Sequence, residues 1–309
     1  MAAYLAKTGR LEAGESLVFV QIAGKGNMNY LVRGTTNRRT FILKQSRPWV
    51  EKYPDIVAPF DRALVEAKFY ELLEGTPAAE FMPKLYWTDE ESRILCVEDL
   101  GTRGDRTDLY AGVVLSQDER EQLCRFLSFL HSKRDALPNR EMRKLNHFHI
   151  FVFPFQKENG LALDGVTPGL QRLADGIKKT AGLQAQAREL GELYLSDGEY
   201  LLHGDFFPGS WMGAGDGLKG IDPEFGFTGP REFDLGVFCA HLRIAGTVLE
   251  ESVLETHYLP WKQLDRRLVS AFAGVEILRR LLGVAQLPIA LDLERKRALL
   301  EKAVEDVLG

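Results

Sequence analysis

The stretch "LLHGDFFPGSWMGAGDGLKGIDPEFGF", residues 201–227, carries three carboxylates in an unusual setting. Asp205 follows a His-Gly pair, and Asp222 and Glu224 follow the glycine-rich run 213–217. Apolar residues precede both acidic positions, so the glycines are expected to form a tight turn between two strands. Carboxylates brought together in this way repel one another unless a cation lies between them. The stretch therefore predicts a divalent metal site.

The bulk properties of the chain limit its function. Its 309 residues, 45% hydrophobic and 27% charged, are typical of a globular protein of roughly two domains. The formal charge of -5 argues against a broad surface for nucleic acid or anionic membrane. Cys96, Cys124 and Cys239 lie singly in apolar surroundings, which indicates reduced core thiols and a cytoplasmic location. The sequence is compatible with a homodimer but offers no support for one.

The N-terminal third has the pattern of a small sheet. Apolar and polar residues alternate around glycines over 17–45, which predicts three short antiparallel strands. A helix is expected at 61–74, with Asp61 as its N-cap and Gly75 at its end. The segment "SRILCVEDLG", residues 92–101, predicts a further strand.

The rest of the chain is mainly helical in pattern. The polar segment 101–108 separates it from the sheet, so we expect a sheet-rich domain at 1–100 and a helical domain at 101–309. The region 199–227 interrupts the helices with a hairpin. Helical patterns are expected near 116–132, 168–195, 232–246, 262–283 and 291–308.

The first hairpin contains the turn "GKGN". Backbone N–H groups of Gly24, Gly26 and Asn27 would face phosphate oxygens there, because the glycines carry no Cβ. An ordinary glycine hairpin turn is the alternative.

Two charges of opposite sign lie on apolar faces. Lys44 ends the strand "TFILK" on the side of Ile42, and Glu66 shares a helix face with apolar residues. These positions predict an ion pair. In the alternative, Lys44 extends to solvent and Glu66 pairs with Arg62.

Along the chain, a glycine turn is followed by a strand lysine, a helix glutamate and two loops with aspartates. Kinase-type phosphoryl transfer, which needs positioned phosphates and neutralised charge, uses these parts in the same order. Asp205 is then the base that accepts the proton of the acceptor hydroxyl, while Asp222 and Glu224 bind Mg²⁺. For His203 we expect a structural hydrogen bond to nearby backbone. Asp234 is expected to hold the loop backbone or to cap the following helix.

The segments "HGDFFPGS" and "IDPEFGFTGPREFDLG" resemble the catalytic and metal loops of the aminoglycoside phosphotransferase and choline kinase superfamily. The Asp-Pro-Glu triplet is most similar to that of the 5-methylthioribose kinases. The resemblance extends over nearly the whole chain, through "GKGNMNYLVR", "FILKQSRPWV", "DRALVEAKFY", "VEDLG" and "FAGVEILRRLLGVAQL".

The resemblance implies an α+β, bilobal protein-kinase-like fold, with a small antiparallel-sheet N-lobe and a larger, mainly helical C-lobe. It also implies ATP and Mg²⁺ as cofactors and a small-molecule hydroxyl as acceptor. Lys44 would contact the ATP phosphates, and backbone groups of Glu98 and Leu100 would contact adenine. Ser210 stands where many members of the superfamily have an asparagine metal ligand, and Glu224 would compensate for this weaker ligand.

The resemblance places Arg279 and Arg280 near the acceptor. In the alternative, the two cations cap the end of their helix before Gly283. The chain departs from the 5-methylthioribose kinases at Phe206-Phe207-Pro208, at Gln286 and over 146–155.

The acceptor therefore stays open among a methylthioribose-like sugar, an aminoglycoside, choline and a homoserine-type alcohol. A non-catalytic nucleotide-binding regulatory module and a metal-dependent hydrolase are the competing hypotheses.

Overall fold

The computed structural model describes residues 1–24, 28–215, 217–287 and 289–309. The chain divides into two compact units, Met1–Thr102 and Arg103–Gly309. The boundary expected from the sequence lay between residues 100 and 101, within the same polar segment. Among the described residues, none of the helices is long and apolar enough to cross a membrane.

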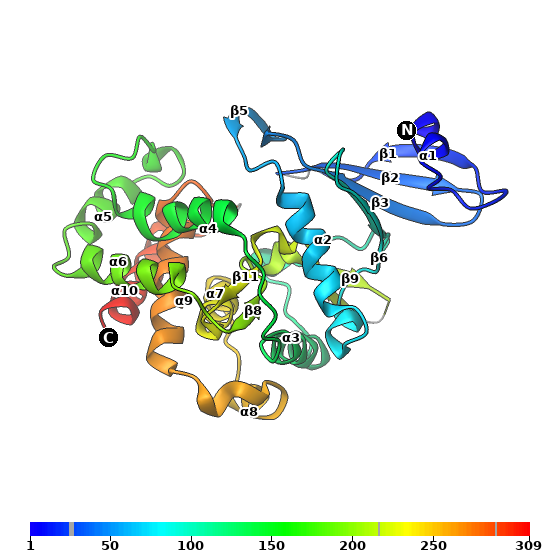
Figure 1. The fold of residues 1–309 in the computed structure, drawn as a ribbon. Coiled ribbons are helices and arrows are strands. Elements are labelled where there is room, and N and C mark those ends of the chain that lie inside the picture. The colour runs from blue at the N-terminus through cyan, green and yellow to red at the C-terminus, as the bar shows by residue number, and fades with distance from the viewer. Residues whose placement is uncertain (25–27, 216, 288) are drawn as a thin grey trace. The chain divides into compact units, whose positions relative to one another are not determined.

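The N-terminal unit contains an antiparallel five-stranded sheet of order β1-β2-β3-β7-β6 (Figure 1). The three strands predicted over 17–45 and the strand predicted at 92–101 are confirmed. The strands of this unit are β1 (Leu17–Ile22), β2 (Tyr30–Thr36), β3 (Thr40–Gln45), β4 (Trp49–Val50), β5 (Tyr53–Val57), β6 (Leu85–Asp89) and β7 (Ile94–Glu98).

Alternation along β3 places its side chains on two faces. Phe41 and Leu43 join Cys96 of β7 and Leu5 of helix α1 (Ala2–Lys7) in a small core. Lys44 projects to the other face and is only 5% exposed. The sheet thereby fixes a lysine in a buried position.

Helix α2 (Arg62–Leu73) is confirmed, and its predicted apolar face is buried. Asp61 stands at the N-cap position, but its side chain makes no cap hydrogen bond and instead pairs with Arg93 at 2.5 Å. Gly75 follows the helix with φ at +72°, a conformation that glycine adopts without strain. Asp61 is therefore the N-cap residue, as predicted, but it does not cap the helix through its side chain, because an ion pair uses its carboxylate.

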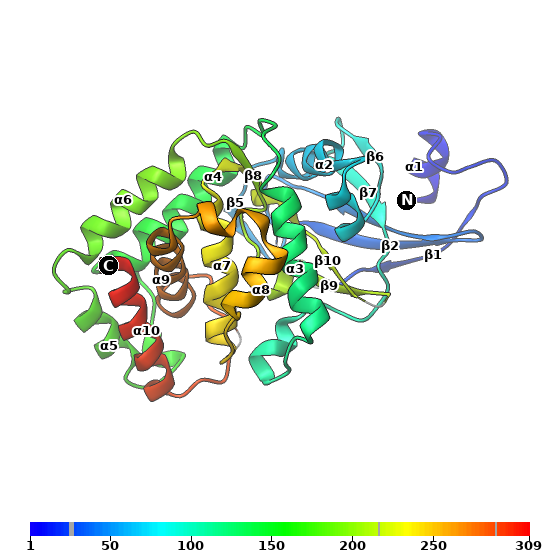
Figure 2. The same cartoon turned by 90° about the horizontal axis from the view of Figure 1, so that it is seen from below.

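The C-terminal unit is mainly helical (Figure 2). The expected helix at 168–195 is two helices, because Gly182 adopts φ of +81° between them. Helices α4 (Arg140–His147) and α8 (Glu251–His257), and the π-helical turn Phe148–Val152, were not predicted. The helices of this unit are α3 (Gln117–Leu130), α4 (Arg140–His147), α5 (Leu170–Ile177), α6 (Leu183–Leu195), α7 (Arg231–Ile244), α8 (Glu251–His257), α9 (Arg266–Leu282) and α10 (Leu293–Leu308).

Helix α9 packs against both α7 and α10 at the centre of this unit (Figure 2). Two glycines allow this close approach. A Cβ on Gly236 of α7 would lie 2.7 Å from Cβ of Phe272, and one on Gly274 of α9 would lie 2.5 Å from the carbonyl of Ala303. Twelve residues of α9 are buried, including Glu276, Arg279 and Arg280. The charged residues of α9 are therefore held in a tightly packed core.

Four short strands carry the acidic loops. The hairpin β9 (Trp211–Ala214) and β10 (Gly217–Gly220) confirms the predicted glycine turn. Strand β8 (Tyr200–Leu202), which precedes Asp205, pairs with β11 (Phe227–Gly229). The sequence had suggested that β8 itself pairs with the strand before Asp222, which is wrong, because β9 occupies that place.

Candidate active site

The backbone of the loop that carries Asp205 is held by a buried carboxylate. The side chain of Asp234, on α7, accepts hydrogen bonds from the backbone N–H of His203 at 2.6 Å and of Gly204 at 2.9 Å. His131 approaches the same carboxylate at 3.2 Å. Of the two roles expected for Asp234, the structure shows the first, which is to hold loop backbone, and the backbone that it holds belongs to the Asp205 loop.

Hydrogen bonds also join this loop to the one that carries Asp222. His203 Nε2 lies 2.9 Å from the carbonyl of Ile221, and the Ile221 N–H donates to the carbonyl of Ser210 at 2.9 Å. Burial lowers the pKa of His203, so the ring is neutral at pH 7 and Nε2 carries the donated proton. The structural role expected for His203 is confirmed. Asn139 donates to the carbonyls of Glu224 and Gly226, both at 2.9 Å.

The candidate metal ligands lie on this joined pair of loops. Asp222 has φ of 61° and ψ of 46°, in the left-handed region that residues other than glycine seldom adopt. Glu224 is 6% exposed and Ser210 is 2% exposed. All three offer oxygen atoms, the donors that Mg²⁺ prefers, and Mg²⁺ needs only one or two carboxylates when phosphates and water complete its shell. The donor set therefore fits Mg²⁺.

Asp205 does not join these ligands. Among the described residues, no three His, Cys, Asp or Glu side chains form a group that could hold a metal. The expected convergence of Asp205, Asp222 and Glu224 on one ion is not formed, because the carboxylate of Asp205 is paired with arginines instead. Oδ1 of Asp205 lies 2.8 Å from Arg280 Nη2 and 3.4 Å from Arg279 Nη1.

Arg279 and Arg280, hereafter the arginine pair, are 5% and 6% exposed. Both contact Glu276 one turn earlier on α9, Arg279 through Nη1 at 3.0 Å and Arg280 through Nε at 2.6 Å. The guanidinium of Arg280 also lies 4.5 Å above the ring of Phe207. These contacts direct the arginine pair to Asp205, which differs from the alternative in which both cations cap the helix end.

In the N-terminal unit, Nζ of Lys44 lies 2.7 Å from Oε1 of Glu66. The hydroxyl of Tyr70 donates to the same oxygen at 3.0 Å, and Glu66 is fully buried. Arg62 instead donates to backbone carbonyls, among them those of Arg47 at 2.7 Å and Pro59 at 2.8 Å. The predicted pairing of Lys44 with Glu66 is confirmed.

We expect Glu66→Gln to lower stability by about 3 kcal/mol, because it leaves the buried ammonium of Lys44 without its carboxylate. It should also raise the KM for ATP about tenfold, since Lys44 is no longer fixed. Thermal unfolding and steady-state kinetics measure both effects. The matched control is Glu71→Gln on the same helix, where Glu71 pairs with Lys68 at 3.3 Å and both side chains are about half exposed. Equal effects of the two substitutions would contradict this account.

The remaining residues predicted to bind nucleotide are placed as follows. Gly24 has φ of +70°, as a glycine turn requires, whereas Gly26 and Asn27 lie outside the described residues. Glu98 ends β7, and its N–H donates to the carbonyl of Lys84 at 2.8 Å. Leu100 follows in the loop and is half-buried. Their contacts with ATP stay predictions.

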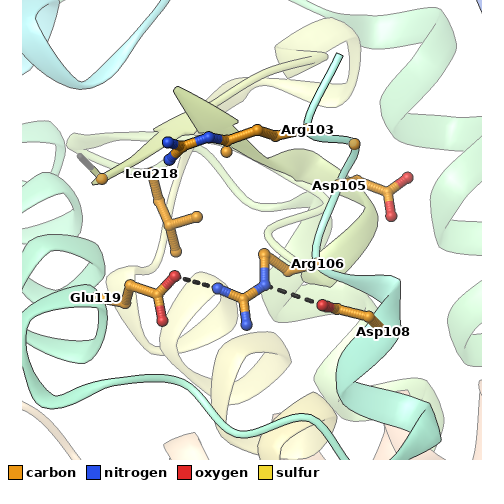
Figure 3. Close-up of a pocket in the computed structure, with 9 residues that line it drawn as sticks. Arg103, Asp105, Arg106, Asp108, Glu119 and Leu218 are labelled. Carbon is orange, nitrogen blue, oxygen red and sulfur yellow. Dashed lines mark hydrogen bonds and ion pairs between the residues drawn. The ribbon is translucent and has the colours of Figure 1, made fainter. Parts of the chain in front are cut away.

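A separate cavity of about 270 Å³ lies in the C-terminal unit beside the β9–β10 hairpin (Figure 3). Its central cation, Arg106, pairs with Asp108 at 3.1 Å and with Glu119, as the dashed lines in Figure 3 show. The lining residues include neither Asp205 nor the predicted metal ligands. Asp205 and the predicted metal ligands therefore lie outside this cavity.

Sequence reasoning missed several residues of the site. These are Asn139, Glu276, His241, which contacts Glu276 at 3.0 Å, and Tyr110, whose hydroxyl lies 2.6 Å from His241. A signal existed for Glu276, because an acidic residue three and four positions before two arginines is well placed for ion pairs on a helix. Asn139, Tyr110 and His241 gave none, because their partners are distant in sequence.

Comparisons with known proteins support the same chemistry. The chain is 26% identical to a methylthioribose kinase of Exiguobacterium sibiricum over 333 residues, covering 91% of this chain and 83% of the relative. It is 26% identical to the methylthioribose kinase of Bacillus velezensis in an alignment 357 positions long, which covers 97% of this chain and 89% of the relative. It is 27% identical to that of Bacillus cereus strain G9842 over 344 residues, with coverage of 95% and 86%.

Solved structures share the fold. A choline kinase from Streptococcus pneumoniae matches with a TM-score of 0.51 and 15% identity, covering 99% of this chain and 98% of the other. A spectinomycin phosphotransferase, solved with ADP and spectinomycin, matches with a TM-score of 0.54 and 11% identity, with coverage of 100% and 98%. These likenesses show the protein-kinase-like α+β fold.

A family model described as the phosphotransferase enzyme family matches residues 20–268. That span includes Lys44, Glu66, Asp205, Asp222 and Glu224. With the methylthioribose kinase relatives, it identifies an enzyme that uses ATP to phosphorylate a small molecule. The chain belongs to the phosphotransferase enzyme family.

Proposed function

We propose that this enzyme transfers the γ-phosphate of ATP to a hydroxyl of a neutral, methylthioribose-like sugar, with Asp205 as the general base. The observation that carries the proposal is the setting of Asp205, whose Oδ1 is held by the arginine pair. Both ion pairs use the same oxygen, so Oδ2 is the atom assigned to the acceptor hydroxyl.

In the proposed reaction, Oδ2 of Asp205 accepts the hydroxyl proton as the acceptor oxygen forms its bond to the γ-phosphorus. The bond from phosphorus to the bridging oxygen breaks, and ADP leaves. Lys44, fixed by Glu66, is assigned to the ATP phosphates. Adenine is assigned to backbone groups of Glu98 and Leu100.

Asp222 and Glu224 are the residues assigned to Mg²⁺, with Ser210 as a further oxygen ligand. When bound, the ion neutralises charge on the phosphates. The chain holds Asp222 in its left-handed conformation from both sides. On one side, the carbonyl of Ile221 accepts a hydrogen bond from His203, and on the other lies the 3-10 turn Pro223–Phe225. The backbone bonds from Asn139 fix the turn from the other side.

The charges around Asp205 favour an uncharged acceptor. The carboxylates of Asp205 and Glu276 balance the arginine pair, so the cluster has no surplus negative charge for choline or an aminoglycoside. A cationic acceptor at Asp205 would lie beside two guanidinium groups, and like charges in such a place cost several kcal/mol. Sugar hydroxyls, in contrast, accept hydrogen bonds from guanidinium N–H groups. The names of the relatives agree with a sugar acceptor.

An acceptor screen tests the proposal. ATP consumption is measured with methylthioribose, ribose, choline, homoserine and an aminoglycoside, and the phosphorylated product is identified by mass spectrometry. We expect kcat/KM for methylthioribose to exceed that for choline and the aminoglycoside on the order of 10²-fold. Preference for a cationic acceptor would refute the neutral-sugar assignment. Release of free phosphate without a phosphorylated acceptor would support hydrolysis instead.

A further inference from the structure

A chain of buried polar side chains continues from Asp205 into the helical core of the C-terminal unit. Arg280 contacts Asp205 through Nη2 at 2.8 Å and Glu276 through Nε at 2.6 Å. His241, on α7, contacts the same Glu276 oxygen through Nε2 at 3.0 Å. The hydroxyl of Tyr110 lies 2.6 Å from Nδ1 of His241. Both Glu276 and His241 are fully buried.

The protonation states in this chain follow from burial and charge. Burial lowers the pKa of His241 to about 4, so the ring is neutral at pH 7 and carries one N–H. Burial alone would raise the pKa of Glu276, but the arginine pair and the His241 bond lower it well below its usual value. Glu276 is thus a carboxylate, which accepts hydrogen bonds and donates none.

These states fix the direction of every hydrogen bond. Because Glu276 only accepts, the proton of His241 lies on Nε2, and Nδ1 accepts from the hydroxyl of Tyr110. Burial raises the pKa of Tyr110, so the phenol keeps the proton that it donates. Tyr110 thereby selects the tautomer of His241 that can donate to Glu276.

Glu276 accepts three hydrogen bonds in a geometry that leaves both arginines little freedom. Its Oε1 accepts from His241 and from Nε of Arg280, and its Oε2 accepts from Nη1 of Arg279 at 3.0 Å. The guanidinium of Arg280 is therefore held at Nε while Nη2 reaches Asp205. A planar guanidinium fixed at one edge presents its other edge in one direction.

We propose that Glu276, oriented by His241 and Tyr110, is a positioning residue for phosphoryl transfer. It fixes the arginine pair against Oδ1 of Asp205, so that Oδ2 is presented to the acceptor hydroxyl. The inference rests on the proposed function, which assigns Asp205 as the base. Glu276 acts through the arginine pair and touches no substrate.

The decisive variant is Glu276→Gln, which keeps the length of the side chain but removes its charge. One oxygen acceptor becomes an NH₂ group that faces an N–H donor, so the arginine pair loses its fixed orientation. We expect kcat for methylthioribose to fall about 10²-fold, because small misplacement of a reacting group has effects of this size. The KM for ATP should stay at the wild-type value, since ATP is not bound by this cluster. A purely structural role would lower stability without this division between kcat and KM.

Glu15→Gln is the matched control. Glu15 lies in the N-terminal unit, is 8% exposed, and accepts from Nε of Arg39 at 3.0 Å. The substitution likewise removes the charge of a buried glutamate that is paired with an arginine, but outside the active-site cluster. It should lower the Tm and leave kcat unchanged. Wild-type kcat in Glu276→Gln, or an equal loss of kcat in Glu15→Gln, would overturn the positioning role.

A second measurement needs no acceptor. Nitrogen-15 NMR of labelled histidine in the whole protein should show His241 neutral with the proton on Nε2, and Tyr110→Phe should shift the Nδ1 signal. Protonation of Nδ1 instead would refute the proposed orientation. Turnover of methylthioribose by the wild-type enzyme tests the proposed function. The ratio of kcat between Glu276→Gln and the wild type, together with the His241 spectrum, tests the role of Glu276. Failure of one proposal can therefore be distinguished from failure of the other.

Discussion

Asp205→Asn is expected to lower kcat by about 10³-fold, within the range that removal of a general base produces. Asparagine keeps the size of the side chain and an oxygen that accepts from the arginine pair, so the loop should retain its structure. The substitution removes the basic atom that accepts the acceptor's proton. Steady-state kinetics with ATP and methylthioribose, combined with calorimetric titration of ATP, separate the chemical step from nucleotide binding.

The affinity for ATP should be unchanged in this variant, because Asp205 is not assigned to the nucleotide. Asp164→Asn provides a control in the same unit, since Asp164 is exposed in the 3-10 turn Leu163–Gly165 and accepts from the N–H of Gln171 at 2.9 Å. This control should retain wild-type kcat. Turnover of Asp205→Asn within tenfold of the wild type would show that another group accepts the proton.

Asp222→Asn is expected to lower kcat by about 10³-fold at a fixed Mg²⁺ concentration, which corresponds to about 4 kcal/mol of lost transition-state stabilisation. Asparagine tolerates left-handed backbone better than most residues, so the φ of 61° should persist. The loss therefore reports the carboxylate charge rather than a rearranged loop.

A Mg²⁺ titration of activity distinguishes this explanation from general damage. The variant should need a higher Mg²⁺ concentration for half-maximal activity, while its Tm without metal stays near the wild-type value. Asp265→Asn is a suitable control, because Asp265 caps α9 by accepting from Arg267 N–H and Asn is an equally good cap. An unchanged Mg²⁺ requirement in Asp222→Asn would refute the metal assignment.

Local patterns in the sequence were sufficient for much of the fold. Alternation predicted β1, β2 and β3, and helical periodicity predicted α2, α3, α7, α9 and α10. The pairing of Lys44 with Glu66 followed from two charges on apolar faces, and the structure places them 2.7 Å apart. In each case the signal lies within one element or its immediate neighbours.

The parts that were not predicted depend on contacts between distant segments. Strand β8 pairs with β11, and no local pattern distinguishes β11 from β10 as its partner. The sequence around Asp205 predicted that its carboxylate faces a metal. In the structure it pairs with the arginine pair, which lies more than 70 positions later in the chain. His241 lies within an apolar helical pattern and faces Glu276 on another helix, so its role required the packing of α7 against α9.

A crystal structure of the enzyme with Mn²⁺ and a non-hydrolysable ATP analogue tests the central assignment most directly. Mn²⁺ replaces Mg²⁺ at oxygen sites and is located by its anomalous scattering. The account predicts an anomalous peak within bonding distance of the carboxylates of Asp222 and Glu224 and of phosphate oxygens. Asp205 should still be paired with the arginines. A nucleotide-bound structure whose Mn²⁺ lies away from Asp222 and Glu224 would contradict it.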